Sequence, residues 1–153
     1  MGPEVDVRDL REEDLAAWRP LWDGYNAFYG RSGETALPQE VVRTTWERLM
    51  DPSVPVHGLV GELDGDVVAV AHFLFHPTTT RVEPVCYLED LFTAESVRGR
   101  GAGRALIEEV ARRAGAAGAA ELYWHTQESN ATARHLYDRV AERSGFIHYT
   151  RAT

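Results

Sequence analysis

The sequence predicts a single α/β (α+β) domain over residues 1–153, in which a mixed sheet carries helices on its faces. Three observations predict this class. The 153 residues are 44% hydrophobic and 26% charged, which is ordinary for one globular domain with a sizeable core. Two apolar runs flank Asp64-Gly65, a strong β-hairpin signal. After this hairpin, strand and helix patterns alternate, which favours a mixed sheet covered by helices.

The individual elements follow from apolar periodicity and turn residues. Strand patterns occur at Val5–Arg8, Val56–Leu63, Asp66–Phe75, Pro84–Thr93, Glu121–Thr126 and Phe146–Thr150. Helical patterns occur at Arg11–Phe28, Pro38–Leu49, Gly101–Ala117 and Asn130–Arg143. We expect Gly24 to break the first helix near its end and residues 25–33 to form an aromatic loop. The apolar content of Pro84–Thr93 predicts a position inside the sheet.

Composition narrows the classes of function. The net charge of −8 disfavours nucleic acid and suits a cationic or neutral partner. The single cysteine, Cys86, excludes an intrachain disulfide framework and a cysteine metal cluster. No apolar run approaches the roughly 20 residues that span a bilayer, and the first residues do not resemble a secretion signal. We therefore expect a cytoplasmic protein that binds neither membrane nor nucleic acid.

The most informative segment is Arg98–Arg104, which follows a predicted strand and opens a predicted helix. Its glycines, Gly99, Gly101 and Gly103, let consecutive backbone N–H groups converge on an anion. The helix N-terminus and the arginines of the segment add positive charge. The spacing fails the Gly-x-Gly-x-x-Gly dinucleotide fingerprint in both registers, and the chain has no lysine for a nucleotide-triphosphate loop. A diphosphate ligand is expected, and a soluble strand-to-helix turn is the alternative.

Four features together resemble the GNAT superfamily of N-acetyltransferases: Tyr87–Thr93, the Arg-x-x-Gly-x-Gly motif of Arg98–Gly103, Asn130 and Tyr137. The Leu-Glu-Asp run within Tyr87–Thr93 is similar to a run in the central strand of the diamine (spermidine/spermine-like) subgroup. The resemblance extends from about Val56 onward and is looser before it. It implies a mostly antiparallel sheet of six to seven strands with about four helices on both faces. It also implies a homodimer that moves acetyl from acetyl-CoA to a primary amine of a small molecule, such as a polyamine or amino acid, or of a peptide.

The resemblance places acetyl-CoA along the glycine-rich loop and the strand before it. Backbone N–H groups of the loop would bind the diphosphate. The pantetheine arm would lie where the Leu88–Thr93 and Leu122–Thr126 strands splay apart. A β-bulge near Glu89–Leu91 would free a backbone N–H, such as that of Leu91, for the thioester oxygen. The cofactor-binding residues expected on this basis are Leu91, Phe92, Thr93, Arg98, Gly99, Arg100, Gly101, Ala102, Gly103, Arg104 and Asn130.

Asn130 and Tyr137 are candidate ligand contacts on the last predicted helix. Seven residues make nearly two helical turns, so both side chains point the same way about 10.5 Å apart, and one extended ligand can touch both. The resemblance implies that Asn130 holds the pantetheine arm and that Tyr137 protonates the departing CoA thiolate. The alternatives are a helix N-cap for Asn130 and core packing for Tyr137.

Glu89 and Asp90 are the candidates for the catalytic base. The resemblance implies that the Glu of this pair deprotonates the substrate ammonium, often through water. Neighbouring strand residues point to opposite faces, so only one carboxylate should face the cleft unless a bulge rotates the backbone. We favour Glu89 as the base and keep Asp90 as the alternative. The non-catalytic alternative is one ion-paired and one solvent-facing carboxylate.

Aromatic residues near the end of the first helix are candidates for an amine pocket, because aromatic faces attract an ammonium. The substrate-binding residues expected are Tyr25, Phe28, Tyr29 and Glu89. Packing of the helix on the sheet explains Trp18 and Trp22 better than it explains the tyrosines.

Other candidates carry less weight. Cys86 as an acyl-carrying nucleophile conflicts with the direct transfer that the resemblance implies. His72 and His76 lie roughly 13 Å apart on one strand, too far to share a metal ion. His125, at the end of a strand beside the expected cleft, can touch substrate. The alternative functions are a non-catalytic CoA-binding regulatory module and a dinucleotide-dependent oxidoreductase, which the glycine spacing disfavours.

Overall fold

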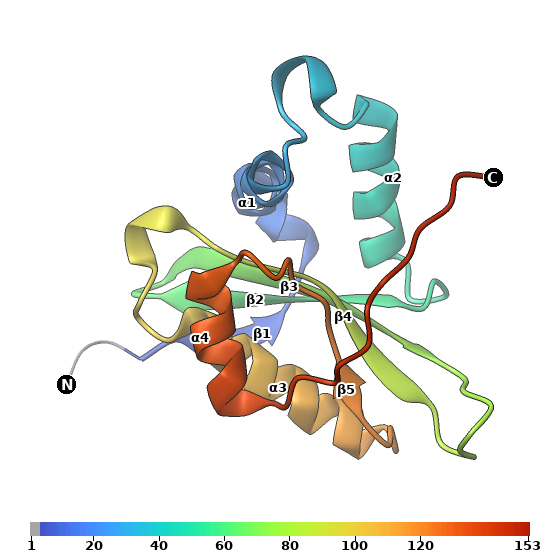
Figure 1. Ribbon diagram of the computed structural model, residues 1–153. Helices are drawn as coiled ribbons and strands as arrows, with labels where there is room; N and C mark the ends of the chain where they lie inside the picture. The colour runs from blue at the N-terminus through green and yellow to red at the C-terminus, as the bar shows by residue number, and fades with distance from the viewer. Residues whose placement is uncertain (1–3) are drawn as a thin grey trace.

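The computed structural model describes residues 4–153, and Figure 1 shows a central sheet between two pairs of helices. The strands are β1 Asp6–Asp9, β2 Val56–Leu63, β3 Asp66–His76, β4 Val85–Thr93 and β5 Leu122–Tyr123. The α-helices are α1 Leu15–Phe28, α2 Gln39–Met50, α3 Ala102–Ala116 and α4 Ala131–Val140. Short 3₁₀ turns occupy Glu12–Asp14, Gly33–Thr35 and Glu95–Val97. The four helices and the mixed sheet confirm the predicted fold class.

The sheet has the order β1-β2-β3-β4-β5, antiparallel throughout except for the parallel pair β4 and β5. The expected mostly antiparallel arrangement is confirmed, and so is the interior position of β4. Asp64 and Gly65 join β2 to β3 with φ angles of 54° and 84°, the paired positive values that a two-residue type I′ hairpin turn requires. The expected six to seven strands are wrong for the described residues, which form five.

Two apolar cores cover the two faces of this sheet. The core beneath α3 is mostly aliphatic and contains Leu59, Ala69, Ala71, Phe73, Cys86, Leu88, Ala102, Leu106, Ile107, Val110 and Ala114. The core beneath α1 and α2 is rich in tryptophan and contains Trp18, Leu21, Trp22, Val42 and Val70. Leu136, Tyr137 and Val140 of α4 pack against the first core. The side chains of α4 therefore belong to the same face as those of α3.

A β-bulge interrupts β4. Opposite β3, His72 pairs with Asp90 whereas Phe73 pairs with Leu88, so Glu89 is an extra residue in the ladder. The inserted residue reverses the alternation of faces along the strand. Leu88 packs in the α3 core. Asp90, two residues later in the strand, instead forms a hydrogen bond with His72 and lies toward α1. The bulge expected near Glu89–Leu91 is confirmed.

The two parallel strands stay together only briefly. The pairs Cys86–Leu122 and Tyr87–Tyr123 are the whole of their register, so the strands separate beyond Tyr87. The expected splay is confirmed, although β5 ends at Tyr123 rather than at Thr126. Without ladder partners on the cleft side, the chain after Tyr123 cannot continue as a strand.

The break expected at Gly24 is wrong, because α1 runs through it to Phe28. A Cβ at residue 24 would lie 2.8 Å from the Phe92 ring, so a close approach between helix and sheet explains this glycine. Tyr25 and Phe28 consequently belong to the last turns of the helix, and the loop begins only at Tyr29. The aromatic loop of the prediction is in part a helix end.

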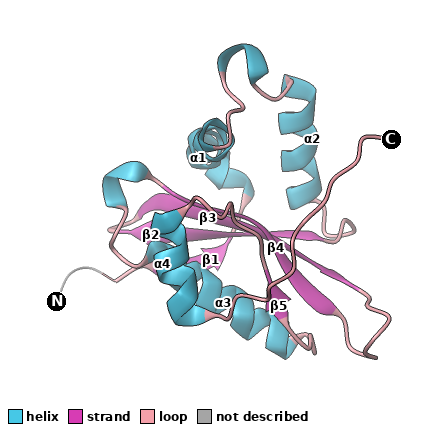
Figure 2. Cartoon of the chain, in the orientation of Figure 1, coloured by secondary structure: helices cyan, strands magenta, loops and turns pink. Residues whose placement is uncertain are grey.

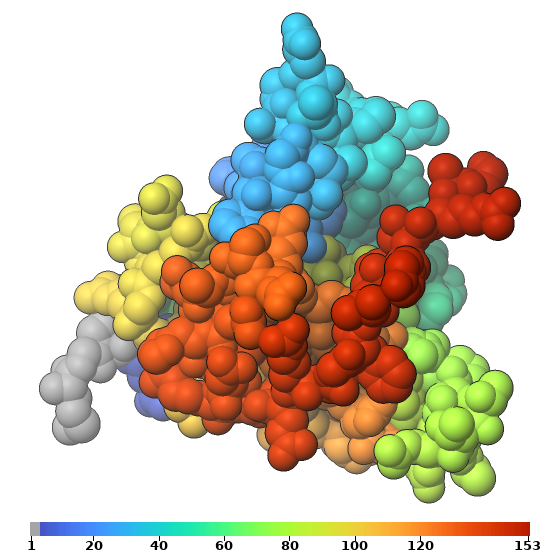
Figure 3. Space-filling view, viewed as in Figure 1, coloured from blue at the N-terminus to red at the C-terminus, as the bar shows by residue number. Residues whose placement is uncertain are grey.

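The C-terminal segment differs most from expectation. Helix α4 ends at Val140, and residues 142–153 form no helix or strand (Figure 2). The strand expected at Phe146–Thr150 is therefore wrong. Its alternating pattern is suited to a ladder, but the segment pairs with no strand of the described sheet, and Phe146 and Ile147 are 94% and 73% exposed. Figure 3 shows this segment, in red, crossing the surface beside α4.

Candidate active site

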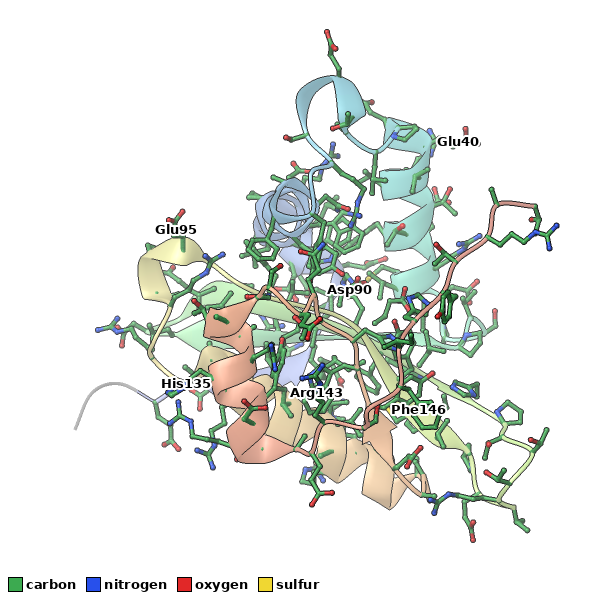
Figure 4. All side chains as sticks on the ribbon, in the orientation of Figure 1. Glu40, Asp90, Glu95, His135, Arg143 and Phe146 are labelled. Carbon is green, nitrogen blue, oxygen red and sulfur yellow. The ribbon has the colours of Figure 1, made fainter. Side chains whose placement is uncertain are left out.

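A cleft of about 1720 Å³ opens beside β4 at the level where β4 and β5 separate. Its lining brings together the carboxylates Glu89 and Asp90 and the phenols Tyr25, Tyr29 and Tyr137. Figure 4 places Asp90 over the middle of the sheet, between α1 and α4. Side chains from three separate segments thus converge on one space beside the bulge, as an active site requires.

Asp90 is held from the core side by a buried chain of hydrogen bonds. Trp18 Nε1 donates to Nε2 of His72 over 3.0 Å, and Nδ1 of His72 lies 2.9 Å from Oδ2 of Asp90. An indole N–H can only donate, so Nε2 is the acceptor and Nδ1 carries the proton that His72 donates to Asp90. Trp18 and His72 are 0% and 2% exposed. The bulge and this chain together fix the Asp90 carboxylate at the wall of the cleft.

Glu89 occupies the bulge itself, on the exposed rim of the cleft. Partial desolvation, followed by the charge of Asp90, raises the pKa of Glu89 above its ordinary value. The rotated backbone lets both carboxylates line one space, which regular alternation would forbid. The prediction that only one of them faces the cleft in a regular strand is therefore set aside by the bulge.

Aromatic rings form the wall opposite the carboxylates. Trp22 stacks on Tyr25 with ring centroids 5.1 Å apart, and Tyr25 contacts Tyr29 at 5.0 Å. Burial, followed by the charge of Asp90, raises the pKa of both tyrosines, so both phenols are neutral at pH 7. Phe28, the last residue of α1, is 52% exposed and lies outside the lining of the cleft. Its expected contact with the substrate stays a prediction.

Tyr137 reaches the cleft from α4 and packs edge-on against Trp124, with ring centroids 5.4 Å apart. Burial raises the pKa of Tyr137 to about 12. The phenol consequently keeps its proton through the neutral range and can donate it. Its place on the apolar face of α4 also confirms the packing role weighed as the alternative.

The glycine-rich loop has the geometry of an anion cradle. Gly99 and Gly101 have φ angles of 82° and 86°, in the left-handed region that favours glycine. Gly101 is the N-cap of α3 and makes no side-chain cap hydrogen bond, which leaves first-turn N–H groups for a ligand. A Cβ at either glycine would meet no atom within 4 Å. The loop is therefore open above its backbone and suits a diphosphate.

Two of the three arginines of the loop, Arg98 and Arg104, bond within the chain, whereas Arg100 forms no side-chain hydrogen bond or ion pair within residues 4–153. Arg98 Nε donates to the Thr93 carbonyl over 3.2 Å, and its guanidinium lies 5.3 Å from the centre of the Phe92 ring. Arg104 pairs with Glu108 over 2.9 Å, one turn along α3. Backbone amides, rather than the guanidinium groups of Arg98 and Arg104, are therefore the ready donors of the cradle.

The strand expected to pair with the pantetheine arm uses its side chains for packing. Leu91 packs against the α3 core and Phe92 against the α1 core. Both residues pair with β3, and the edge of β4 away from β3 has no ladder partner among the described residues beyond Tyr87. Asn130 caps α4, since its Oδ1 accepts from the Ala133 N–H over 3.3 Å. The capping alternative for Asn130 is confirmed, and its contact with acetyl-CoA stays a prediction.

The remaining candidates have structural roles. Cys86 is 0% exposed, and burial raises the pKa of its thiol to about 11, which disfavours a nucleophilic thiolate. His76 Nε2 lies 2.7 Å from Tyr123 Oη, and His125 Nδ1 lies 3.2 Å from Tyr87 Oη. Within residues 4–153, no three His, Cys, Asp or Glu side chains come together as metal ligands. No helix of this range is long and apolar enough to cross a bilayer.

The chain matches the Acetyltransferase (GNAT) family model over residues 15–141. The protein belongs to the GNAT acetyltransferase family. It is an acetyltransferase that uses acetyl-CoA, and the open glycine cradle ahead of α3 fits the diphosphate of that donor. The readings as a non-catalytic module or a dinucleotide-dependent oxidoreductase are set aside.

Relatives of this GNAT chain span nearly its whole length. The D-amino-acid N-acetyltransferase HPA3 of Saccharomyces cerevisiae is 37% identical over 99% of this chain and 92% of its own. The aminoglycoside N-acetyltransferase AAC(6')-Iy shares the fold with a TM-score of 0.80, at 20% identity over 99% of this chain and 97% of its own. The ribosomal-protein-alanine N-acetyltransferase of Brucella melitensis biovar Abortus 2308 has a TM-score of 0.74 at 20% identity, covering 98% of this chain and 100% of its own.

Two parts of this GNAT site escape sequence reasoning. The sequence pattern suggests only a metal-ligand role for His72, whereas in the structure His72 anchors Asp90. A histidine inside an otherwise apolar strand is a usable signal, because a buried imidazole needs a partner. The sequence pattern assigns no role to Arg31 or to its support Asn26. A buried polar residue on the inner face of an amphipathic helix, such as Asn26, is the signal that identifies them.

Proposed function

We propose that the cleft acetylates the amino group of small primary amines, free amino acids first among them. The observation that carries the proposal is the bulge, which brings Glu89 and Asp90 to one cleft while His72 anchors the second. The 37% identity to a D-amino-acid N-acetyltransferase supports amino acids as the acceptor class. The Leu-Glu-Asp run keeps diamines as the second candidate, and the acidic wall suits either amine.

The two carboxylates have different parts in this proposal. Asp90 is fixed and draws the substrate ammonium toward the bulge. Glu89 takes the proton, directly or through water, so that the amine has a lone pair for attack. Its raised pKa makes it a stronger base than an ordinary glutamate. This division explains why a pair serves better than one carboxylate.

Tyr137 is the general acid of the proposal. As CoA leaves, its thiolate needs a proton, and a phenol with a pKa of about 12 still carries one at neutral pH. Tyr137 and the two carboxylates line the same cleft. The amine would therefore lose its proton at β4 and the leaving sulfur would gain one from α4. Backbone amides of the 99–103 loop and of β4 would hold the acetyl donor.

An amine panel tests the proposed function. Purified protein with acetyl-CoA is given D- and L-amino acids, diamines, an aminoglycoside and a short peptide, and CoA release and product mass are measured. We expect acetylated amino acids as the leading products. A protein that binds acetyl-CoA and releases no CoA with any amine would refute the proposal. The homodimer and the cytoplasmic location stay predictions, and light scattering on the purified protein tests the first.

A further inference from the structure

We propose that Arg31 binds a carboxylate of the acceptor, so that the cleft selects amines that also carry an acid group. The proposal rests on the proposed function, because it assigns a second recognition point to the same cleft. Arg31 lies just after α1, is half-buried and lines the cleft with Tyr25 and Tyr29. A guanidinium presents a planar fork of donors that matches a carboxylate.

Hydrogen bonds from the Nε and the backbone N–H of Arg31 to Asn26 fix the position of the Arg31 side chain. Its Nε donates to Asn26 Oδ1 over 2.7 Å, and its backbone N–H donates to the Asn26 carbonyl over 2.8 Å. Asn26 is 4% exposed and is itself fixed by donating to the Trp22 carbonyl over 2.8 Å. The inner nitrogen is therefore committed to the protein, and the terminal nitrogens are the ones left for a ligand.

Two tyrosine rings support the guanidinium. Its central carbon lies 5.9 Å from the centre of the Tyr25 ring and 5.6 Å from that of Tyr29. Such contacts orient the guanidinium plane without using its donors. Within residues 4–153 no carboxylate forms an ion pair with Arg31, in a chain whose net charge is −8. A half-buried cation with no internal counterion is suited to an anion brought by substrate.

The other cations of the cleft are less suited to this task. Arg143 pairs with Glu128 over 3.2 Å, and Arg134 donates to the Glu128 carbonyl over 2.8 Å. Arg48 lines the cleft from the exposed end of α2, without an ion pair within the described chain. Arg48 is therefore the competing candidate, and the test must include it.

The Asp90 carboxylate and the Arg31 guanidinium both act on the phenols of Tyr25 and Tyr29. The Asp90 carboxylate raises the pKa of Tyr25 and Tyr29, whereas the Arg31 guanidinium lowers it. Both charges are therefore near both phenols. An amino acid carries an ammonium that suits Asp90 and a carboxylate that suits Arg31. A diamine would bring a second ammonium toward Arg31 and be repelled, so this arrangement favours amino acids over diamines.

The test compares acceptors that differ only in the acid group. Initial rates are measured for alanine and alaninamide, each as both enantiomers, and for 1,3-diaminopropane. We expect Arg31→Gln to lower kcat/KM for the better alanine enantiomer by about 10- to 100-fold, mainly through KM, since bonds to a charged group are lost. Alaninamide should change less than about threefold by the same reasoning. Arg19→Gln, which removes the same charge from an exposed pair on α1, is the matched control.

Three results would overturn the proposal. One is an equal loss for alanine and alaninamide in Arg31→Gln, a second is no loss for either, and the third is a selective loss in Arg48→Gln instead. Arg31→Lys keeps the charge without the fork and should retain part of the selectivity, which guards against a variant that merely disturbs the loop. A series of glycine, β-alanine and 4-aminobutyrate then measures the preferred spacing between amine and acid.

Failure of the proposed function gives a different result. If the wild type acetylates no amine, calorimetry with N-acetylalanine still tests Arg31. Binding to the wild type that is lost in Arg31→Gln supports the carboxylate site, and equal binding or none overturns it. If the wild type acetylates diamines and alaninamide better than alanine, the acetyltransferase proposal stands and the carboxylate site falls.

Discussion

The two faces of the sheet are covered by different kinds of side chain. Beneath α3 the core is aliphatic, with Leu106 and Val110 both 0% exposed. Beneath α1 the core combines tryptophans with two buried polar residues, Asn26 and His72, which are 4% and 2% exposed. Each of these polar groups supports a charged residue of the cleft, Arg31 and Asp90 respectively. One face thus mainly stabilises the fold, and the other also aligns chemistry.

The comparison has an energetic side. Apolar contacts tolerate repacking as long as volume is kept, whereas a buried hydrogen-bond chain fails when one member is lost. Substitutions beneath α3 should therefore reduce stability and leave the activity of the folded molecules alone. Substitutions in the cleft should lower activity and leave stability nearly unchanged. Substitutions on the two faces of the sheet can therefore separate stability from activity.

Leu106→Ala should have the largest effect. A fully buried leucine truncated in a packed core should cost about 2–5 kcal/mol of unfolding free energy. Urea unfolding measures it, and kcat per folded molecule at low temperature should match the wild type. A large fall in kcat with little loss of stability would contradict the division between the faces.

Tyr137→Phe should lower kcat by about 100-fold, the lower end of what a general acid contributes. The ring and its contact with Trp124 are kept, so stability and the dissociation constant of acetyl-CoA should hardly change. Stopped-flow measurement of CoA release gives the rate of the chemical step, and steady-state release gives kcat. Calorimetry gives the dissociation constant of acetyl-CoA. An unchanged rate of the chemical step would remove Tyr137 as the acid.

Glu89→Gln should lower kcat/KM by about 10- to 100-fold and change its pH dependence. Activity needs the ionised carboxylate, so the wild-type rate should fall as pH drops through the raised pKa of Glu89. That acid limb should lie above the ordinary glutamate value of about 4.3 and vanish in the variant. Should Asp90→Asn lose the limb instead, the base would be Asp90.

His72→Gln should have a smaller effect, raising KM for the amine by about tenfold because Asp90 loses the donor that fixes it. KM for acetyl-CoA should stay the same, which a general loosening of the fold would not allow. Trp18→Phe removes the donor to His72 together with part of a fully buried ring. It should therefore lower stability and shift KM for the amine in the same direction as His72→Gln by less. Equal changes in both KM values would make His72 purely structural.

The fold and the conformation of the glycine-rich loop could be predicted from sequence because their signals are local. Asp64-Gly65 dictates its own turn, and the glycines before α3 need the positive φ values that they adopt. The bulge at Glu89 followed from resemblance, not from pattern. Its presence was what allowed both carboxylates, rather than one, to face the cleft.

The rest depended on contacts between distant segments. Nothing near His72 in the sequence indicates Trp18 and Asp90, which lie 54 and 18 residues away. Gly24 resembles a helix breaker until the Phe92 ring is placed against it. The strand expected at Phe146–Thr150 has the right alternation, but a strand also needs an edge to pair with, and local pattern does not supply one.

The extra residue at Glu89 decides which face of the sheet each later side chain of β4 lies on. Were Glu89 paired with β3 as an ordinary strand residue, Asp90 would lie on the face beneath α3, and Leu91 and Phe92 would exchange cores. Deleting Glu89 would remove one of the two carboxylates of the cleft and leave Asp90 facing α1. An added residue that the ladder had to pair would instead turn Asp90 and two core side chains to the wrong faces at once.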